Sequence, residues 1–459
     1  MPRGDTAPDR YTTPCRDDFG DFVEREHRAG RLVVQPRMGF AAPEAMRAGL
    51  LATRNAAATT VGTITLDSYT RTGDRAAADR ALRDGADLNG YPLVNHSPAT
   101  TRAVLDGIRD RDFPVQVRHG SAAPQHIFRA LAKTGIAATE GGPVSYCLPY
   151  GRTPLEQSVR NWQEGCELAL GLRQFGLEPH LETFGGCMLG QLCPPGMLVA
   201  MSVLEALFFH HHGIRSLSVS YAQQTNFDQD REAVLALRRL CAELLPDTRP
   251  HVVVYAYMGV YPATPEGAFA LLGEAAGLAV ATGAQRLIVK TEAEASRIPT
   301  VAENVAALEH AATVAGAPSA APPPDPGGDS QTYAEAAALV EAVRNLHPDL
   351  GEALLVAFRR GYLDIPYCLH PDNSGRTRSA IDAAGRLRWT ALGALPLAGL
   401  VETGPEQPAL TSSGLLTALA HMRTRFDRPE LDDPRHPRGG TGRGRLVSRD
   451  PVHVSSSCY

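Results

Sequence analysis

The segment SLSVSYAQQTNFDQDREAVLALRRLCAELLPDTRPHVVVYAYMG (216–259) contains a complete strand–helix–strand unit. Its two ends, SLSVSY (216–221) and HVVVYAYMG (251–259), are short runs rich in β-branched and aromatic residues, as buried strands are. The stretch DREAVLALRRLCAELL (230–245) between them is rich in alanine and leucine and favours a helix. A connection of this length predicts two parallel strands joined by a covering helix.

The same alternation runs through the chain from about residue 30. The further candidate strands are LVVQPR (32–37), ATTVGTIT (58–65), PLVNH (92–96), FPVQVRHG (113–120), IAATEGG (136–142), HLETFGG (180–186) and RLIVKTE (286–292). Helical stretches separate them, and glycine closes several of these where a helix C-cap is expected: Gly135, Gly176, Gly213 and Gly283. Eight such units predict an α/β fold, a (β/α)8 TIM-type barrel of about 250 residues. Nine candidates compete for eight places, so we expect IAATEGG or PLVNH to be something else.

Changes in composition divide the chain into five parts. We expect an N-terminal arm (1–29), the barrel (30–315) and a Pro/Gly-rich linker, GAPSAAPPPDPGGDSQ (316–331). A mixed, partly irregular C-terminal region (332–426) follows. The tail (427–459) has little apolar periodicity, and we expect it to be poorly ordered.

The composition is that of a soluble globular protein. The 459 residues are 43% hydrophobic and 21% charged, with a formal net charge of -5. Lysine and arginine are scattered, so nucleic acid is not implied. No run approaches the ~20 apolar residues of a membrane span, the first residues lack the apolar core of a signal peptide, and the eight cysteines form no CxxC pair. The sequence therefore predicts a reduced, cytoplasmic protein.

Three arginines follow candidate strands. Arg37 closes LVVQPR, Arg71 follows TITLDSYT, and Arg118 closes FPVQVRHG. In a barrel the carboxyl ends of all the strands meet on the catalytic face. Arginine keeps its charge, and its planar fork matches a carboxylate. Convergence would therefore predict a ligand with two carboxylates or a phosphate, whereas the bland alternative is three unrelated salt bridges.

Other side chains at these ends refine the ligand. Glu140 ends IAATE and could hold an ammonium group, and Tyr146 and Tyr150 in SYCLPY add hydroxyls and apolar walls. An amino diacid such as glutamate fits this set. A phosphate sugar is the rival, but it usually comes with a Gly-rich loop after the late strands, which is lacking here. His119 is either a structural imidazole beside Arg118 or a catalytic group.

Several motifs, taken in order, resemble a known family. They are QPRMG, TLDSYTR, LNGYP, QVRHG, EGGPVSYCLPY, FGGCMLGQLCPP, MGVYP and VKTEAEASRIPT. From about residue 30 to 400 the chain resembles the large (epsilon) subunit of adenosylcobalamin-dependent glutamate mutase, also called methylaspartate mutase. The resemblance implies a barrel that encloses the adenosyl side of coenzyme B12, shared with a separate small subunit. It implies radical isomerisation of L-glutamate to (2S,3S)-3-methylaspartate.

The resemblance also assigns roles to individual residues. Arg37, Arg71 and Arg118 would hold the substrate carboxylates, with His119 beside the substrate. Glu140 would take the substrate ammonium and handle a proton, while Tyr146 and Tyr150 would line the pocket. The positions that would contact the cofactor are Gly39, Asn89, Pro149, Tyr261, Lys290, Glu294 and Ile298. The resemblance assigns no metal ligand to this chain.

One absence bears on the partner. Cobalamin modules that bind cobalt through a histidine carry Asp-x-His-x-x-Gly, and the sequence contains no Asp-x-His. We therefore expect a small cobalamin-binding subunit to supply that histidine, with a homodimer of this chain inside a heterotetramer. The family pattern is broken at Met38, Val260, Tyr261 and HPDNSG (370–375). The alternatives are a mutase acting on a related amino diacid in secondary metabolism, and a non-catalytic barrel that binds an amino diacid or a partner.

Overall fold

The computed structural model describes residues 19–86, 88–149, 151–185, 192–248, 250–317, 329–402 and 411–431. Eight parallel strands follow one another around a ring in the order β1-β8-β7-β6-β5-β4-β3-β2. Their bounds are β1 (Val33–Gln35), β2 (Gly62–Thr65), β3 (Val115–Arg118), β4 (Ala138–Glu140), β5 (His180–Glu182), β6 (Ser216–Ala222), β7 (His251–Tyr255) and β8 (Arg286–Ile288). A parallel bridge between Val34 and Thr60 joins the two ends of this sheet. The predicted TIM-type barrel is confirmed.

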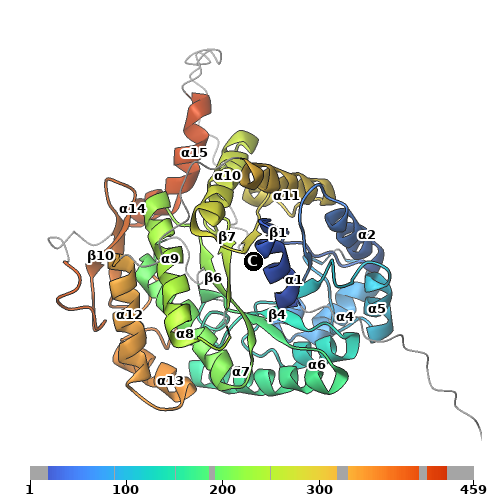
Figure 1. Cartoon of the computed structure of the whole chain (residues 1–459), viewed down its shortest axis with the longest axis horizontal. Coiled ribbons are helices and arrows are strands. Elements are labelled where there is room, and N and C mark those ends of the chain that lie inside the picture. The colour runs from blue at the N-terminus through green and yellow to red at the C-terminus, as the bar shows by residue number, and fades with distance from the viewer. Residues whose placement is uncertain are drawn as a thin grey trace, which may run out of the picture.

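Helices surround the strands, as Figure 1 shows. They are α2 (Pro43–Arg54), α3 (Ser68–Thr72), α4 (Arg75–Arg83), α5 (Pro98–Leu105), α6 (Gln125–Thr134), α7 (Leu155–Leu170), α8 (Pro195–His211), α9 (Phe227–Leu244), α10 (Pro265–Thr282) and α11 (Val301–Gly316). The predicted glycine caps are in place: Gly135 and Gly283 end α6 and α10 with φ of 70° and 64°, which only glycine adopts without strain.

The ninth candidate strand is PLVNH. Only Tyr91, just before it, extends the sheet, through a single bridge to Leu66. The chain then turns, because the backbone N–H groups of Asn95 and His96 both donate to the carbonyl of Pro92 at 3.0 Å. Proline also removes a donor that a strand would need. IAATEGG, by contrast, supplies β4.

Helix α1 (Phe19–Arg28) closes the amino end of the barrel. Phe19, Phe22 and Val23 are buried in a cluster with residues that begin or precede strands, namely Val33, Val61 and Ala138. This helix falls in the segment predicted as an arm. Its apolar face covers the base of the barrel, so ligands reach the interior from the carboxyl end.

The C-terminal region adds helices α12 (Gln331–Arg344), α13 (Leu350–Arg360), α14 (Ser412–Leu419) and α15 (His421–Leu431) and a hairpin of β9 (Arg378–Ile381) and β10 (Leu387–Ala391). In Figure 1, α12 and α13 lie outside the ring beside α8 and α9. The predicted linker and tail fall largely outside the described residues, so the proposed domain boundaries remain predictions. No helix in the described ranges has the length and apolar character needed to cross a bilayer.

Candidate active site

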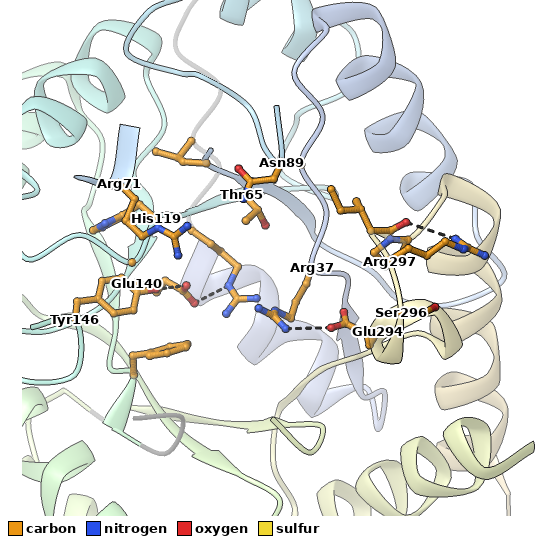
Figure 2. Close-up of a pocket in the computed structure, with 17 residues that line it drawn as sticks. Arg37, Thr65, Arg71, Asn89, His119, Glu140, Tyr146, Glu294, Ser296 and Arg297 are labelled. Atoms are coloured by element: carbon orange, nitrogen blue, oxygen red, sulfur yellow. Dashed lines mark hydrogen bonds and ion pairs between the residues drawn. The ribbon is translucent and has the colours of Figure 1, made fainter. Parts of the chain in front are cut away.

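A cavity of about 430 Å³ opens at the carboxyl ends of the strands. Arg37, Arg71 and Arg118 all border it, so the three arginines converge on one space. Its full lining is Arg37, Gly39, Thr65, Leu66, Arg71, Asn89, Arg118, His119, Gly120, Glu140, Tyr146, Phe184, Glu294, Ser296, Arg297, Ile298 and Pro299. Figure 2 shows Arg71, His119, Glu140 and Tyr146 on one side of the cavity, with Arg37 and Glu294 on the other.

Arg118 and Glu140 form a buried ion pair on the first side. They end the neighbouring strands β3 and β4, and Arg118 Nε donates to Glu140 Oε2 at 2.7 Å. The Tyr146 hydroxyl donates to the other carboxylate oxygen. Burial works against the charge of Arg118, but Glu140 beside it raises the pKa of Arg118 overall. Arg118 Nη1 has no hydrogen-bond partner within the described residues, which leaves a buried donor for a ligand carboxylate.

The opposite side carries a chain of three charges. Arg37 Nη1 lies 3.7 Å from Glu294 Oε2, and Lys290 Nζ lies 3.4 Å from the same oxygen. The Lys290 ammonium sits over the ring of Tyr261, 4.8 Å from its centre. Arg37 Nε is buried, and the described part of the chain gives it no partner. On this side the Glu294 carboxylate faces two cations, Arg37 and Lys290, so the net charge of the three groups is positive.

His119 presents a neutral imidazole. Its Nδ1 accepts the backbone N–H of Ser121 at 3.1 Å, so the proton must be on Nε2. Burial, followed by the charges of His126 and Arg71, lowers the pKa of His119 to about 3. The ring stacks on Trp162 with centroids 5.7 Å apart, and Nε2 has no partner among the residues described. The ring is thus packed among aromatic side chains, and its Nε2–H lies at the cavity wall.

Close backbone packing positions the remaining wall. Arg71 lies in the last turn of α3, and a Cβ on Gly120 would stand 2.9 Å from Arg71 Cδ. Asn89 Oδ1 accepts the backbone N–H of Ser68 at 3.0 Å and so holds the start of α3. A Cβ on Gly39 would lie 2.2 Å from the carbonyl oxygen of Thr65, so only glycine fits there.

Some nominated residues lie elsewhere. Pro149, Tyr261 and Lys290 do not line the cavity; Lys290 and Tyr261 lie behind Glu294, and Tyr150 falls outside the described residues. Burial raises the pKa of Tyr261, with Glu294 adding to the effect. Met38 is buried and packs toward Gly49 of α2, so this departure from the family pattern does not enter the cavity.

Sequence reasoning missed part of the lining. The missed residues are Thr65, Leu66, Gly120, Phe184, Ser296, Arg297 and Pro299. Phe184 lies two residues after the end of β5, which was a usable signal. Ser296, Arg297 and Pro299 flank the nominated Ile298 in the motif VKTEAEASRIPT, so this motif was a usable signal for them as well.

A loop after β4 carries Tyr146, and two distant segments hold it. Glu205 of α8 accepts the backbone N–H groups of Val144 at 3.0 Å and Ser145 at 2.8 Å. Burial raises the pKa of Glu205 to about 7. From the C-terminal region, Asp372 in HPDNSG accepts the backbone N–H of Leu155 at 2.7 Å. The motif that departs from the family pattern therefore supports the loop from outside.

The described residues contain no group of three or more His, Cys, Asp or Glu side chains that could hold a metal ion. His210 and His211 end α8 and lie beside Asp247 and Asp349.

Comparison with known proteins matches residues 13–408 to the family described as Methylaspartate mutase E chain (MutE). The chain belongs to this family. The glutamate mutase epsilon subunit of Escherichia coli O157:H7 is 29% identical over 405 residues, which cover 84% of this chain and 83% of that protein. The epsilon subunit of Halobacterium salinarum is 32% identical over 348 residues, or 72% and 71% of the two chains. A putative phosphonomutase from Burkholderia cenocepacia J2315 covers 60% of this chain and 91% of its own at 14% identity, with a TM-score of 0.33 that is too low to carry an argument.

Proposed function

We propose that this methylaspartate mutase E chain is the substrate-binding subunit of an adenosylcobalamin-dependent isomerase that interconverts L-glutamate and (2S,3S)-3-methylaspartate. The observation that carries the proposal is the convergence of Arg37, Arg71, Arg118 and Glu140 on one cavity. Two carboxylates and one ammonium would complement this set, because arginine pairs with carboxylates and Glu140 offers the opposite charge.

Each wall has a defined task in this proposal. Arg118 is fixed by Glu140 through Nε, so its outer nitrogen is oriented before a ligand arrives. Arg71 and His119 Nε2 add donors from the same side, and Tyr146 keeps the Glu140 carboxylate in position. Glu140 would hold the substrate ammonium and take or return its proton at a carboxylate oxygen. Such preorganised donors spend little free energy on rearrangement when the substrate binds.

The residues on the β8 side fit a nucleoside-bearing cofactor. Arg37 Nε is a buried polar atom beside the cavity without a partner in the described ranges, and the cavity volume is that of a small-molecule site. We propose that Gly39, Asn89, Glu294 and Ile298, which line the cavity, contact the adenosyl side of the cofactor, and that Pro149, Tyr261 and Lys290 support them from outside the lining. Bound adenosylcobalamin supplies the hydrogen-abstracting radical.

This chain's own residues would shield the reaction. Arg118, His119, Glu140 and Tyr146 are each at most 4% exposed, so little water reaches them. Exclusion of water strengthens charge interactions and keeps reactive species from side reactions. The rim is different, because Ile298 is 56% exposed.

The partner in this proposal is a small cobalamin-binding subunit with Asp-x-His-x-x-Gly. A homodimer of this chain would bind two copies of it. The whole sequence lacks Asp-x-His, so this chain alone should bind adenosylcobalamin weakly. Tight cobalamin binding through a histidine of the isolated chain, seen in its absorption spectrum, would contradict the two-subunit proposal.

The direct test combines this chain, the small subunit from a neighbouring gene, adenosylcobalamin and L-glutamate. Formation of 3-methylaspartate, followed by NMR, is the expected result. Related amino diacids are assayed in parallel. Turnover of one of them without turnover of glutamate would replace the substrate, whereas binding without turnover of any would favour a non-catalytic barrel.

A further inference from the structure

Tyr255 stands between two buried carboxylates. It is the last residue of β7, and its hydroxyl lies 2.9 Å from Glu140 Oε2 and in close contact with Glu182 Oε1. Glu140 and Glu182 are register partners at the ends of β4 and β5. All three side chains are at most 1% exposed. Glu140 borders the cavity, whereas Glu182 and Tyr255 are not part of its lining.

Neighbouring side chains keep Glu182 ionised. Arg286, at the start of β8 and fully buried, pairs with its Oε2. Gln116 and Ser218 donate to the same oxygen at 3.1 Å and 3.2 Å. Although burial alone would raise it, the charge of Arg286 and the hydrogen bonds from Tyr255 and Gln116 lower the pKa of Glu182. This carboxylate therefore stays charged and competes with Glu140 for the Tyr255 O–H.

One phenol has one proton, yet two carboxylates compete for it. We propose that Tyr255 is a positioning residue that gives its O–H to Glu140 while Glu140 is ionised and turns it to Glu182 when Glu140 takes a proton. No covalent bond changes in this step, because the proton stays on the phenol and only its acceptor changes. The inference rests on the proposed role of Glu140 as the group that handles the substrate proton.

The arrangement satisfies both charge states of Glu140 without moving a charged group. The groups that face Glu140 are Arg118 from β3, Tyr146 from the loop after β4, Glu182 from β5 and Tyr255 from β7. Ionised Glu140 receives three donors, from Arg118, Tyr146 and Tyr255. Protonated Glu140 needs fewer, and its own O–H can then donate to the Tyr255 oxygen. A fully buried network tolerates both states only if every member keeps a partner.

The ring of Tyr255 has a separate role. The Arg118 guanidinium lies 5.2 Å from its centre, so a phenylalanine at this position keeps the cation–π contact and loses only the hydroxyl. Tyr255→Phe therefore removes the hydroxyl and leaves the ring in place. The molecule also offers a matched control in Tyr221 on β6, which is equally buried and donates to a buried carboxylate, Asp230, at 2.7 Å. Neither Tyr221 nor Asp230 lines the cavity.

The test follows the protonation of Glu140 directly. Infrared difference spectra of the full chain, with Glu140→Gln as the reference, give the midpoint of the Glu140 carboxyl titration. Loss of a donor to a carboxylate raises its pKa, so Tyr255→Phe should move the midpoint up by about one pH unit, a tenfold change in the proton affinity. Tyr221→Phe should not move it. An unshifted midpoint in Tyr255→Phe, or an equal shift in Tyr221→Phe, overturns the inference.

A second pair of measurements covers the remaining outcomes. In the complete enzyme, Tyr255→Phe should lower kcat more than it changes KM and shift the acidic limb of the pH profile upward. If Tyr255→Phe does not fold, 3-fluorotyrosine incorporated at position 255 carries the test in the opposite direction. Fluorine makes the phenol O–H a stronger donor and leaves both carboxylates in place, so the midpoint should fall, and no downward shift refutes the inference. A wild type without turnover would end the proposed function, yet the infrared titration would still decide the role of Tyr255.

Discussion

Two buried arginine–glutamate pairs lie inside this barrel, and they differ in what the arginine does with its other nitrogens. Arg286 pairs with Glu182 and also donates from its two outer nitrogens to Gln35, Gln116 and Ser218, so only its Nε lacks a partner within the described residues. Arg118 pairs with Glu140 through Nε alone and leaves Nη1 without a partner beside the cavity.

The difference separates a pair that organises the core from one prepared for a ligand. A buried ion pair stabilises a fold only if its remaining donors and acceptors are also hydrogen-bonded. The Arg286–Glu182 pair nearly meets that condition by itself. The Arg118–Glu140 pair does not meet it unless a ligand binds, because desolvated guanidinium donors without acceptors cost free energy.

The same substitution in the two glutamates should have different consequences. Glu140→Gln should cut turnover by about 10²- to 10⁴-fold, the usual contribution of a group that transfers a proton. It should lower the free energy of unfolding less than Glu182→Gln does, because Arg118 borders the cavity whereas Arg286 does not. Glu182→Gln leaves the Arg286 charge uncompensated and should cost about 3–5 kcal/mol in the free energy of unfolding. Activity assays beside thermal and urea melts check both. A collapsed melt for Glu140→Gln would instead make Glu140 a structural partner of Arg118.

Glu205 sharpens the comparison because it is a buried glutamate with no arginine. Its pKa is about 7 in the folded protein, and it returns to its ordinary value of 4.5 on unfolding. The folded state therefore binds more protons between these values, so this contribution to stability is present at pH 4.5 and is lost as the pH rises through 7. Glu205→Gln removes the effect and should gain up to about 3 kcal/mol over wild type between pH 5 and 8.

The measurement is urea denaturation of both proteins across that range. Glutamine keeps an oxygen for the backbone N–H groups of Val144 and Ser145, so the loop should stay in place. A difference in unfolding free energy that does not change with pH would show that Glu205 does not titrate there.

Arg118→Lys is a milder change to the Arg118–Glu140 pair, because it keeps the positive charge. Lysine keeps the charge but has no planar fork, so one ligand contact is lost. The expected cost is about 1.5–3 kcal/mol, or about 10- to 150-fold in substrate affinity. Glutamate binding by calorimetry and the KM of the complete enzyme give the answer. Unchanged values for both would remove Arg118 from the substrate site.

The smallest effect is expected at His119, where the tautomer matters. Glutamine can place its amide N–H near the position of Nε2, whereas asparagine is too short and better mimics Nδ1. His119→Asn should therefore lose about 0.5–1.5 kcal/mol of binding, or about 2- to 10-fold, and His119→Gln less. Glutamate titrations of the two variants check this. Equal losses would mean that the Nε2 proton does not reach the ligand.

Local pattern was enough to predict the barrel and part of the cavity lining. Strand-forming runs alternate with helical stretches along the chain, and a parallel sheet brings the residues after its strands to one face. Arg37, Arg118 and Glu140 were visible for that reason. Periodicity alone could not say whether IAATEGG or PLVNH was the surplus candidate, and the hydrogen bonds to the Pro92 carbonyl decided it.

By itself the sequence determined the fold class, the convergence of arginines on one face and the family. Only the tertiary structure decided which glutamate each arginine would meet. Arg286 contacts Glu182, which lies 104 positions away in the sequence, and Tyr255 contacts Glu140, which lies 115 positions away. No local signal encodes such contacts, since they depend on how eight strands are staggered around the barrel axis. Glu205 makes the same point, because in MLVAMSVLEALFF (197–209) it is one acid in an apolar helix until the fold sets it against Val144 and Ser145.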